Sequence, residues 1–218
     1  MTTRSAGLRE RKKQATREAL REAALRLALE HGPDHVRVED IAEAAGVSPR
    51  TYNNYFSSRE QAIVAAITAE REARVASAVT AQPTEIRLAD AVIEAILAQY
   101  ADPDECRRDA LGLITTHPAL RAVFLGATDT ISKPLAVAIA ERLGDRDELT
   151  ASVLAASVGA AIRVGLEQWL QPPAGVPDTA GFVVVSGSLP DLLRAALAPL
   201  VPAFDAAEKG PRAQPAHR

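Results

Sequence analysis

Apolar side chains recur at helical intervals along the first part of the chain. From Leu20 they fall at positions i, i+3, i+4, i+7 and i+8, ending at Ala28. No proline occurs before Pro33, and Gly32 stands where the pattern stops. Residues 8–31 are therefore predicted to form one long amphipathic helix, since glycine can end a helix in a left-handed conformation at no steric cost.

A shorter pattern follows in residues 38–59, VEDIAEAAGVSPRTYNNYFSSR. Ile41, Ala42 and Ala45 give a first helix one apolar face, and this helix must stop at Gly46. An apolar residue follows the glycine, as is typical of a tight corner between two helices.

A second helix is predicted directly after this corner. The Ser48 hydroxyl can accept hydrogen bonds from the free amides of the first turn, and Pro49 stands where a missing N–H costs nothing. Tyr52 and Phe56, four residues apart, fall on the core side. The side chains that fall largely outside are all polar or hydrogen-bonding: Arg50, Thr51, Asn53, Asn54 and Tyr55.

The rest of the chain is predicted to be helical as well. Residues 58–82 contain neither proline nor glycine and keep a helical pattern, so one long, stiff helix is expected as far as Pro83. Prolines and capping residues then delimit about five more helices. We expect them at residues 84–100, 103–116, 119–143 with a kink at Pro134, 148–170, and 190–204. Residues 181–189 have strand propensity without a partner strand, so the stretch 178–190 is expected to be helical or irregular.

These patterns predict an all-α protein with an N-terminal three-helix module, including a helix-turn-helix, and a C-terminal helical bundle that dimerises. The expected boundaries are 1–57 for the module, 58–75 for a connecting helix, 76–204 for the bundle and 205–218 for a disordered tail. Hydrophobic residues make up 47% of the 218 residues and aromatic residues only 4%, so the core must consist mainly of Ala, Leu, Val and Ile. Neither a signal peptide nor a run of about 18 uncharged apolar residues is present, so a cytoplasmic protein without a membrane partner is expected.

The outward face of the helix after Gly46 suits DNA bases. In a helix-turn-helix, the second helix presents its N-terminal residues to base edges in the major groove. Arginine suits guanine, asparagine suits adenine, and the threonine methyl group suits thymine. The alternative is an ordinary helical corner whose polar face is simply solvated.

The distribution of charge favours the DNA interpretation. Residues 1–26 hold eight Arg and Lys against three Glu, a net charge of +5. The whole chain has 25 basic and 28 acidic residues and a net charge of −3, so residues 27–218 carry −8. Positive charge is therefore concentrated in an N-terminal arm that can contact a phosphate backbone.

Together, the first 60 or so residues resemble the TetR family of transcriptional regulators. The resemblance lies in the order of an amphipathic helix ending at Gly32, then VEDIAEAAGVSPRT, then Tyr55-Phe56, then Ser58-Arg59-Glu60 opening a fourth helix. It implies that Tyr55 and Arg59 contact phosphates. The groove-facing residues that it implies are Ser48, Pro49, Arg50, Thr51 and Asn54.

Two positions depart from the family pattern. Asn53 stands where the family usually has an aromatic residue that contacts the DNA backbone. Arg37-Val38 replaces the threonine that usually caps the second helix, a cap worth about 1 kcal/mol. Arg37 could instead reach a phosphate, so both Arg37 and Asn53 remain candidate DNA contacts.

A homodimer is expected, because two recognition helices about 34–36 Å apart on a palindrome raise affinity and specificity over one. The 148–170 helix and the last helix have small-residue faces suited to close packing, and the resemblance implies a four-helix interface from the final two long helices. The alternative is that these faces pack inside one subunit. The interface candidates on the 148–170 helix are Leu149, Val153, Ala156, Gly159, Ala160, Val164 and Gly165.

A small-molecule effector is the natural reason for the remaining helices. The stretch LITTHPALRAVFLGA, residues 113–127, is similar to the ligand domains of actinobacterial TetR members for which acyl-CoA-like effectors are proposed. An apolar pocket would also suit hydrophobic drugs or antibiotics. Each candidate lining residue has an ordinary interpretation as packing or surface, and Arg163 and Glu167 are most simply an ion pair. The candidates are His117, Arg121, Phe124, Thr128, Asp129 and Trp169.

Motifs of catalytic and metal sites are missing from the sequence. It has no HExxH, CxxC, GxGxxG or GxSxG, and four His with one Cys form no metal quartet, so we expect no catalytic residue, metal or cofactor. The predicted function is a homodimeric repressor released from a palindromic DNA operator by a hydrophobic small molecule. The alternatives are a DNA-binding dimer without an effector, and a helical binding module or enzyme that does not bind DNA.

Overall fold

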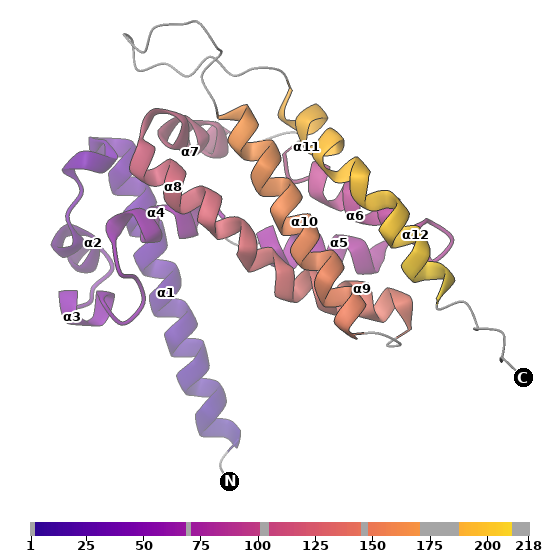
Figure 1. Ribbon diagram of the computed structural model, residues 1–218. Coiled ribbons are helices and arrows are strands. Elements are labelled where there is room, and N and C mark those ends of the chain that lie inside the picture. The colour runs from indigo at the N-terminus through magenta and orange to yellow at the C-terminus, as the bar shows by residue number, and fades with distance from the viewer. Residues whose placement is uncertain (1–2, 69–70, 101–104, 145–147, 171–187, 211–218) are drawn as a thin grey trace, which may run out of the picture. The chain divides into compact units, whose positions relative to one another are not determined.

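The computed structural model describes residues 3–68, 71–100, 105–144, 148–170 and 188–210 (Figure 1). These residues form helices and turns without a strand, which confirms the predicted all-α class. They divide into two compact units. The first unit consists of Met1–Ala69 and Asp104–Phe124, and the second of Glu70–Pro103 and Leu125–Arg218.

The first unit contains the predicted helix-turn-helix. It also takes in residues 104–124, which the sequence pattern assigned to the C-terminal bundle. Its elements are α1 (Thr3–His31), the 3-10 helix η1 (Pro33–His35), α2 (Val38–Ala44), α3 (Pro49–Tyr52), α4 (Arg59–Ile67), α7 (Glu105–Thr116) and α8 (Pro118–Gly126) as far as Phe124.

Helix α1 ends where the sequence predicts. Gly32 follows it with a φ of 81°, a conformation that a residue with a Cβ rarely adopts. The predicted stripe faces the core, because Leu20, Ala24 and Ala28 are fully buried, and α1 packs mainly on α4.

The predicted single helix over residues 58–82 is wrong. Helix α4 ends at Ile67, and α5 (Arg71–Ala81) begins four residues later. Thr68 caps α4, and its hydroxyl donates to the backbone oxygen of Val64 at 3.0 Å. Threonine side chains compete with helical hydrogen bonding in this way, a signal that a search for proline and glycine alone does not detect.

The second unit is a helical bundle. Helix α10 packs most extensively on α9 and α11, while α5 packs on α9 and α6. The elements of this unit are α5, α6 (Leu88–Leu97), η2 (Ala127–Ile131), α9 (Ser132–Leu143), α10 (Glu148–Trp169), α11 (Leu189–Leu197), η3 (Ala198–Leu200) and α12 (Val201–Lys209).

Several predicted boundaries in this unit need correction. Helix α6 begins at Leu88 rather than at residue 84. The predicted helix over 119–143 is split by η2, and Pro134 lies in the first turn of α9, where a missing backbone N–H needs no partner within that helix. The last predicted helix is divided by η3, and residues 205–209 belong to α12 instead of a disordered tail. Residues 171–187 and 211–218, including most of the stretch with strand propensity, lie outside the described residues.

Two glycines of α10 allow close packing within the subunit. A Cβ at Gly159 would lie 3.3 Å from Ser132 Oγ, and a Cβ at Gly165 would lie 3.1 Å from Leu193 Cδ2. The expectation that these glycines face another subunit is therefore wrong, and the alternative of packing inside one subunit holds for them. The predicted ion pair between Arg163 and Glu167 is present, with Nε and Oε1 4.0 Å apart.

Helix α10 is also long and apolar enough to cross a membrane, judged by length and composition alone. Of its most apolar stretch, 44% is buried against the rest of the fold, as in the core helix of a bundle. The other side of α10 is exposed and still apolar, with Leu149 74%, Val153 56% and Val164 55% exposed.

Candidate nucleic-acid interface

The corner between α2 and α3 has the geometry that the sequence predicts. Gly46 adopts a φ of 68°, and its N–H donates to the backbone oxygen of Glu43 at 2.9 Å. The N–H of Val47 donates to the backbone oxygen of Ala42, also at 2.9 Å. These two bonds form a Schellman motif, which closes α2 and directs the chain into α3.

Ser48 caps α3, as predicted. The backbone N–H of Thr51 donates to Ser48 Oγ at 3.1 Å, and the two hydroxyl oxygens lie 2.9 Å apart. Helix α3 is a single turn, shorter than expected, and Asn53, Asn54 and Tyr55 lie in the turn that follows. The N–H groups of Asn54 and Tyr55 donate to the backbone oxygens of Thr51 and Tyr52, at 3.1 and 2.8 Å, so this turn has a fixed backbone as well.

Tyr52 and Phe56 anchor this segment to the core, as predicted. Both are buried, their ring centroids are 5.8 Å apart, and the Tyr52 hydroxyl donates to the backbone oxygen of Ser58 at 2.7 Å. Burial, with the nearby charge of Glu60, raises the pKa of Tyr52 to about 12. The guanidinium of Arg17 lies 5.5 Å from the Phe56 ring centroid, a cation–π contact that joins α1 to the end of the segment.

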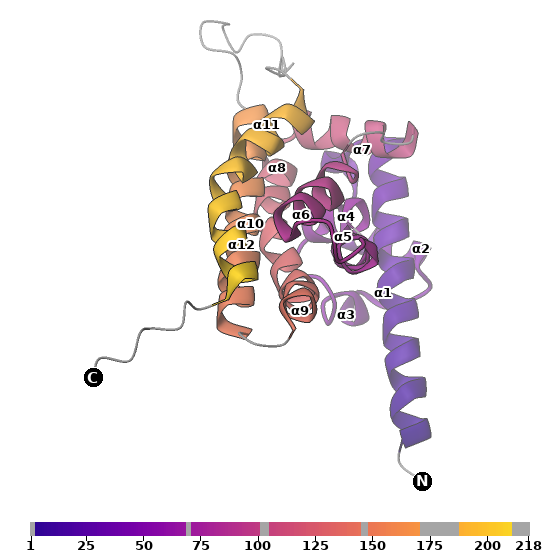
Figure 2. The ribbon, with the colours of Figure 1, turned by 90° about the vertical axis from the view of Figure 1, so that its right-hand side faces the viewer.

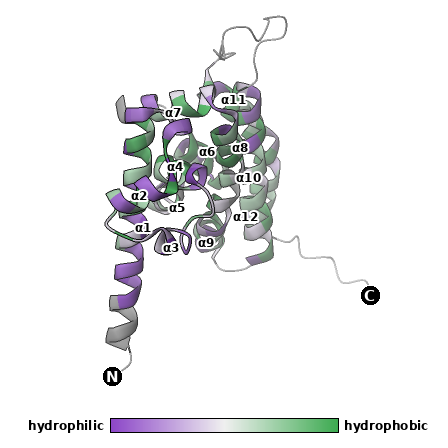
Figure 3. Ribbon diagram, turned by 90° about the vertical axis from the view of Figure 1, so that its left-hand side faces the viewer, coloured by the Kyte–Doolittle hydropathy of each residue, from purple (hydrophilic) through white to green (hydrophobic). Residues whose placement is uncertain are grey.

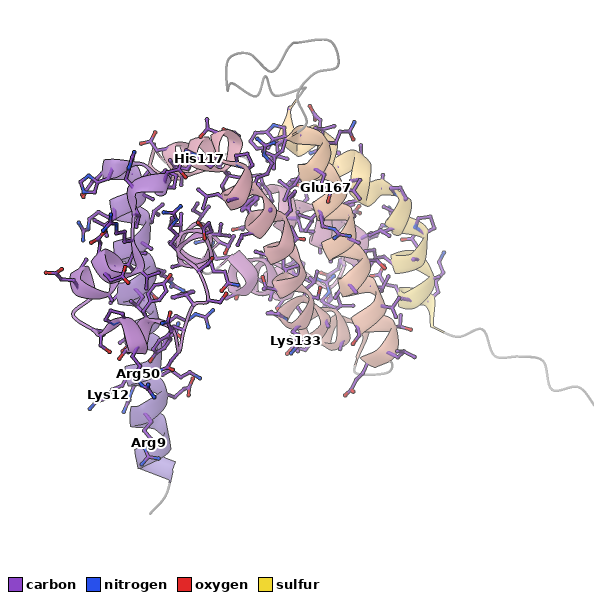
Figure 4. All side chains as sticks on the ribbon, turned by 60° about the vertical axis from the view of Figure 1, so that its left-hand side comes forward. Arg9, Lys12, Arg50, His117, Lys133 and Glu167 are labelled. Atoms are coloured by element: carbon purple, nitrogen blue, oxygen red, sulfur yellow. The ribbon has the colours of Figure 1, made fainter. Side chains whose placement is uncertain are left out.

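The predicted groove-facing surface is open to solvent. Arg50 projects from α3 on the same side of the unit as Arg9 and Lys12 of α1 (Figure 4). Thr51 and Tyr55 are partly exposed. The exposed members are Ser48, Pro49, Arg50, Asn53 and Asn54.

Arg37 precedes α2 and is also exposed. An arginine side chain has no acceptor, so it cannot cap a helix as threonine does. Asp40 compensates in part, because its carboxylate accepts from the backbone N–H of Arg37 at 3.2 Å. Among the described residues, the Arg37 guanidinium has no hydrogen-bond or ion-pair partner, so it is free to contact another molecule.

Arg59 has a role within the protein that the sequence analysis missed. Its Nη1 donates to the backbone oxygens of Asp34 and Val36, both at 2.9 Å, and its Nε donates to Glu60 Oε1 at 2.8 Å. These bonds fix the start of α4 to the loop between α1 and α2. Burial pushes the pKa of Glu60 up, but hydrogen bonds from Arg59, its own backbone and Ser58, with the charge of Arg59, outweigh it and lower the pKa below its usual value.

Asp34 connects this loop to a second part of the unit. Its Oδ1 lies 3.8 Å from Arg59 Nη2, and its Oδ2 lies 3.8 Å from His117 Nε2. His117 stands between α7 and α8, where its Nδ1 lies 3.1 Å from the backbone oxygen of Leu113. One carboxylate therefore lies between the start of α4 and the α7–α8 corner.

The sequence models of two families match the chain. The model described as "Bacterial regulatory proteins, tetR family" matches residues 20–66, and the MftR C-terminal domain model matches residues 82–205, more than half of the chain. The chain belongs to the TetR family. It is a DNA-binding transcriptional regulator, as members of this family are.

Two relatives support this assignment. The chain is 32% identical to the HTH-type transcriptional regulator TcmR of Streptomyces glaucescens over 151 residues, which cover 66% of this chain and 67% of TcmR. It is 45% identical to the regulator BetI of Rhizobium meliloti (strain 1021) over 51 residues, which cover 23% and 25% of the two chains. The first relative extends the TetR-family likeness well beyond the DNA-binding helices.

A solved structure shares the fold. The Thermus thermophilus TetR-family repressor FadR, solved in complex with lauroyl-CoA, superposes with a TM-score of 0.51. The superposition covers 93% of this chain and 99% of FadR, at 19% identity.

The predicted effector-binding residues of this TetR protein belong to different units. His117, Arg121 and Phe124 lie in the first unit, and Thr128 and Trp169 lie in the second. Phe124 and Thr128 are buried, and the Thr128 hydroxyl donates to the backbone oxygen of Leu125 at 2.8 Å. The side chain of Asp129 lies outside the described residues. Their role in ligand binding remains a prediction.

Arg121 has one unusual feature among these candidates. Its Nη2 donates to the backbone oxygen of Thr115 at 2.6 Å, which closes the turn between α7 and α8. Its Nε is buried without a hydrogen-bond partner among the described residues. Over all the residues that the structure describes, no group of three or more His, Cys, Asp or Glu residues is arranged to hold a metal ion.

Proposed function

We propose that this TetR-family regulator is a cytoplasmic homodimeric repressor, which binds a palindromic operator and is released by a hydrophobic small molecule. The observation that carries the proposal is the exposed face of α3 and of the turn after it, held in place by buried Tyr52 and Phe56. A rigid backbone that presents an arginine and two asparagines to solvent suits recognition of base edges.

In this proposal, each exposed side chain has a defined role. Arg50 pairs with guanine and Asn54 with adenine, because these side chains match the donor and acceptor patterns of those bases. Ser48, Pro49 and Thr51 line the groove. Asn53, Tyr55 and Arg37 contact phosphates, which set the position of the protein on the duplex without specifying sequence.

The dimer interface is the exposed apolar face of α10. Monomeric soluble proteins rarely expose a contiguous apolar patch of this kind, so a second subunit is the natural cover. The Arg163–Glu167 pair lies on the same face and can form a polar rim. The residues of this face are Leu149, Val153, Ala156, Ala160 and Val164, all exposed.

An acyl-CoA is the first effector to test, because the structurally similar FadR was solved with lauroyl-CoA. Arg121 supports an effector with an anionic group. Its buried Nε has no hydrogen-bond partner among the described residues, which costs free energy, and an anionic group that accepted a hydrogen bond from Nε would remove this cost. Within the same unit as Arg121, Phe124 and His117 are further candidates for its surroundings.

Release from DNA would start at α7. This helix belongs to the same compact unit as α3, and it packs on both α1 and α4. We call α3 and the turn after it, residues 49–55, the recognition segment. A ligand that displaced α7 would shift α4 and with it the recognition segment. The two recognition segments of a dimer would then no longer match successive grooves of the DNA.

The recognition residues can be tested by single substitutions. The Arg50→Ala and Asn54→Ala variants should each lose about 1 to 3 kcal/mol of preference for one base pair of the half-site. Lys133→Ala, at an exposed site in the second unit, should leave base preference unchanged. If all three variants have the same base preference as the unmodified protein, α3 is not the recognition element.

The effector can be tested separately by thermal denaturation with lauroyl-CoA and a panel of hydrophobic drugs. A ligand that binds the folded state raises Tm, and a true effector also lowers operator affinity. If no compound changes Tm while DNA binding is intact, the effector-independent dimer becomes the better account.

A further inference from the structure

The N-terminal half of α1 includes a stretch of exposed side chains. Residues 9–15 are all exposed, and from residue 9 onward the first buried residue is Leu20. Figures 1 and 2 show this half of the helix extending beyond α3 in two perpendicular views. Figure 3 shows that it is strongly hydrophilic. We call residues 9–17 the helical arm.

The cations of the helical arm differ from those of the rest of α1. In the second half of the helix, Arg21 pairs with Glu18, and Arg26 pairs with Glu30. Among the described residues, four cations of the arm have no acidic partner: Arg9, Arg11, Lys12 and Lys13.

Unpaired cations of this kind weaken an isolated helix. Arg9 and Lys13 are four residues apart, as are Lys13 and Arg17, and like charges at this spacing repel one another. The arm therefore holds a cluster of positive charge on an exposed helix, with Glu10 as its one acidic residue and no ion pair to these four cations among the described side chains. An extended row of anions outside the protein would both neutralise the cluster and stabilise the helix.

We propose that the helical arm lies along the phosphate backbone of operator DNA outside the base pairs contacted by α3. This proposal rests on the DNA-binding function proposed above and extends it to the flanking duplex. Arg17 fixes the base of the arm through its contact with Phe56, the residue that also anchors the recognition segment. Arg9 and Lys12 lie on the same side of the unit as Arg50 (Figure 4), so one duplex can contact both.

The length of the arm sets the size of the extra contact. From Arg17 to Arg9 the helix rises about 12 Å, because each residue adds 1.5 Å. Successive base pairs are about 3.4 Å apart, so the arm can span about three to four base pairs beyond each half-site. Contacts with phosphates alone carry no base preference, and the added affinity should be independent of the flanking sequence.

The test compares the full chain with a variant carrying Arg9→Gln, Arg11→Gln, Lys12→Gln and Lys13→Gln. The affinity of both proteins is measured on two duplexes that contain the site selected by the unmodified protein from a random pool. The short duplex ends at the half-site boundaries, and the long duplex has eight more base pairs on each side. The control carries Lys133→Gln and Lys209→Gln, which remove exposed cations from the second unit. Circular dichroism and Tm verify that each variant is folded.

On the long duplex, the slope of log affinity against log salt should fall in the arm variant by about 0.9 for each lost phosphate contact. With one or two phosphate contacts per arm, the salt slope of the dimeric arm variant should be smaller by about 2 to 4 than that of the unmodified protein. The ratio of the unmodified protein's affinity to that of the arm variant should therefore fall by about tenfold or more between 50 and 200 mM salt. On the short duplex the arm variant and the unmodified protein should bind almost equally. The control should match the unmodified protein on both.

Two results would overturn the proposal. One is an equal loss of affinity on the long and short duplexes, which would place the arm within the half-site. The other is an arm variant with unchanged affinity and salt slope on the long duplex. Failure of the unmodified protein to select or bind any duplex is a separate result, because it would refute the proposed function itself.

Discussion

Arg59 holds the backbone oxygen of Asp34 at 2.9 Å from its Nη1 and thereby fixes the start of α4 to the loop after α1. The same nitrogen also donates to the backbone oxygen of Val36, and Nε is engaged by Glu60. In the free protein, Nε and Nη1 of Arg59 thus donate to the protein itself. The phosphate contact implied by the sequence stays a prediction.

Arg59→Ala should therefore destabilise the fold. Losing bonds to two backbone oxygens should lower the free energy of unfolding by about 1 to 2 kcal/mol, measured by urea denaturation. Operator affinity should fall with little change in salt slope, because the substitution misplaces the recognition segment instead of removing a phosphate contact. Unchanged stability with a salt slope lower by about 0.9 per subunit would restore Arg59 to the phosphate contacts implied by the sequence.

Gly46→Ala should also destabilise the first unit, although space is available for the new side chain. No atom lies within 4 Å of the position that a Cβ would occupy, so the cost comes only from the φ of +68°. A left-handed conformation costs alanine about 1 kcal/mol. Gly46→Asn is the matched control, because asparagine tolerates this conformation, and it should retain more stability than Gly46→Ala in urea denaturation. Equal losses for the two variants would contradict this explanation.

The buried hydroxyl of Tyr52 should make stability depend on alkaline pH. Its folded pKa of about 12 lies above the ordinary value of 10.0, so its contribution is complete below pH 10 and is lost as pH rises towards 12. The loss should reach at most about 3 kcal/mol. In denaturation curves at several pH values, Tyr52→Phe should remove this component, whereas Tyr55→Phe, at a partly exposed position, should keep it. The same pH dependence in both variants would count against the assignment to Tyr52.

The exposed face of α10 should be required for dimerisation. Val153→Glu places a charge in the proposed interface and should give a monomer in light-scattering measurements, with operator affinity lower by about a hundredfold because bivalent binding is lost. Thr80→Glu makes the same kind of change at an exposed site on α5 and should leave the dimer intact. A dimeric Val153→Glu protein would show that another surface joins the subunits.

Local sequence signals were sufficient for the helix-turn-helix. Gly46, Ser48 and Pro49 each act on the nearest backbone groups, so their effects can be derived from adjacent positions, and the structure has the expected turn and cap. The spacing of Tyr52 and Phe56 likewise identified the two buried anchors of the site.

Contacts between distant segments could not be predicted in this way. Arg142 donates to the backbone oxygens of Gln82 and Ile86, at 3.1 and 2.6 Å, and so holds the turn between α5 and α6 from about 60 residues away. Nothing near Arg142 in the sequence indicates this partner. The same reason explains why the bonds from Arg59 to Asp34 and Val36 were not anticipated, and why Gly159 was assigned to a subunit interface rather than to its contact with Ser132.

Selection of duplexes from a random pool by the purified full-length protein is the most direct test of the central claim, that two copies of the Arg50–Asn54 surface recognise DNA together. We predict a palindromic site, with half-site centres about one helical turn of 10 to 10.5 base pairs, or a multiple of it, apart. Arg50→Ala and Asn54→Ala should each relax one position in both halves. A pool that remains random after selection, or enrichment of a single half-site bound by a monomer, would contradict the account.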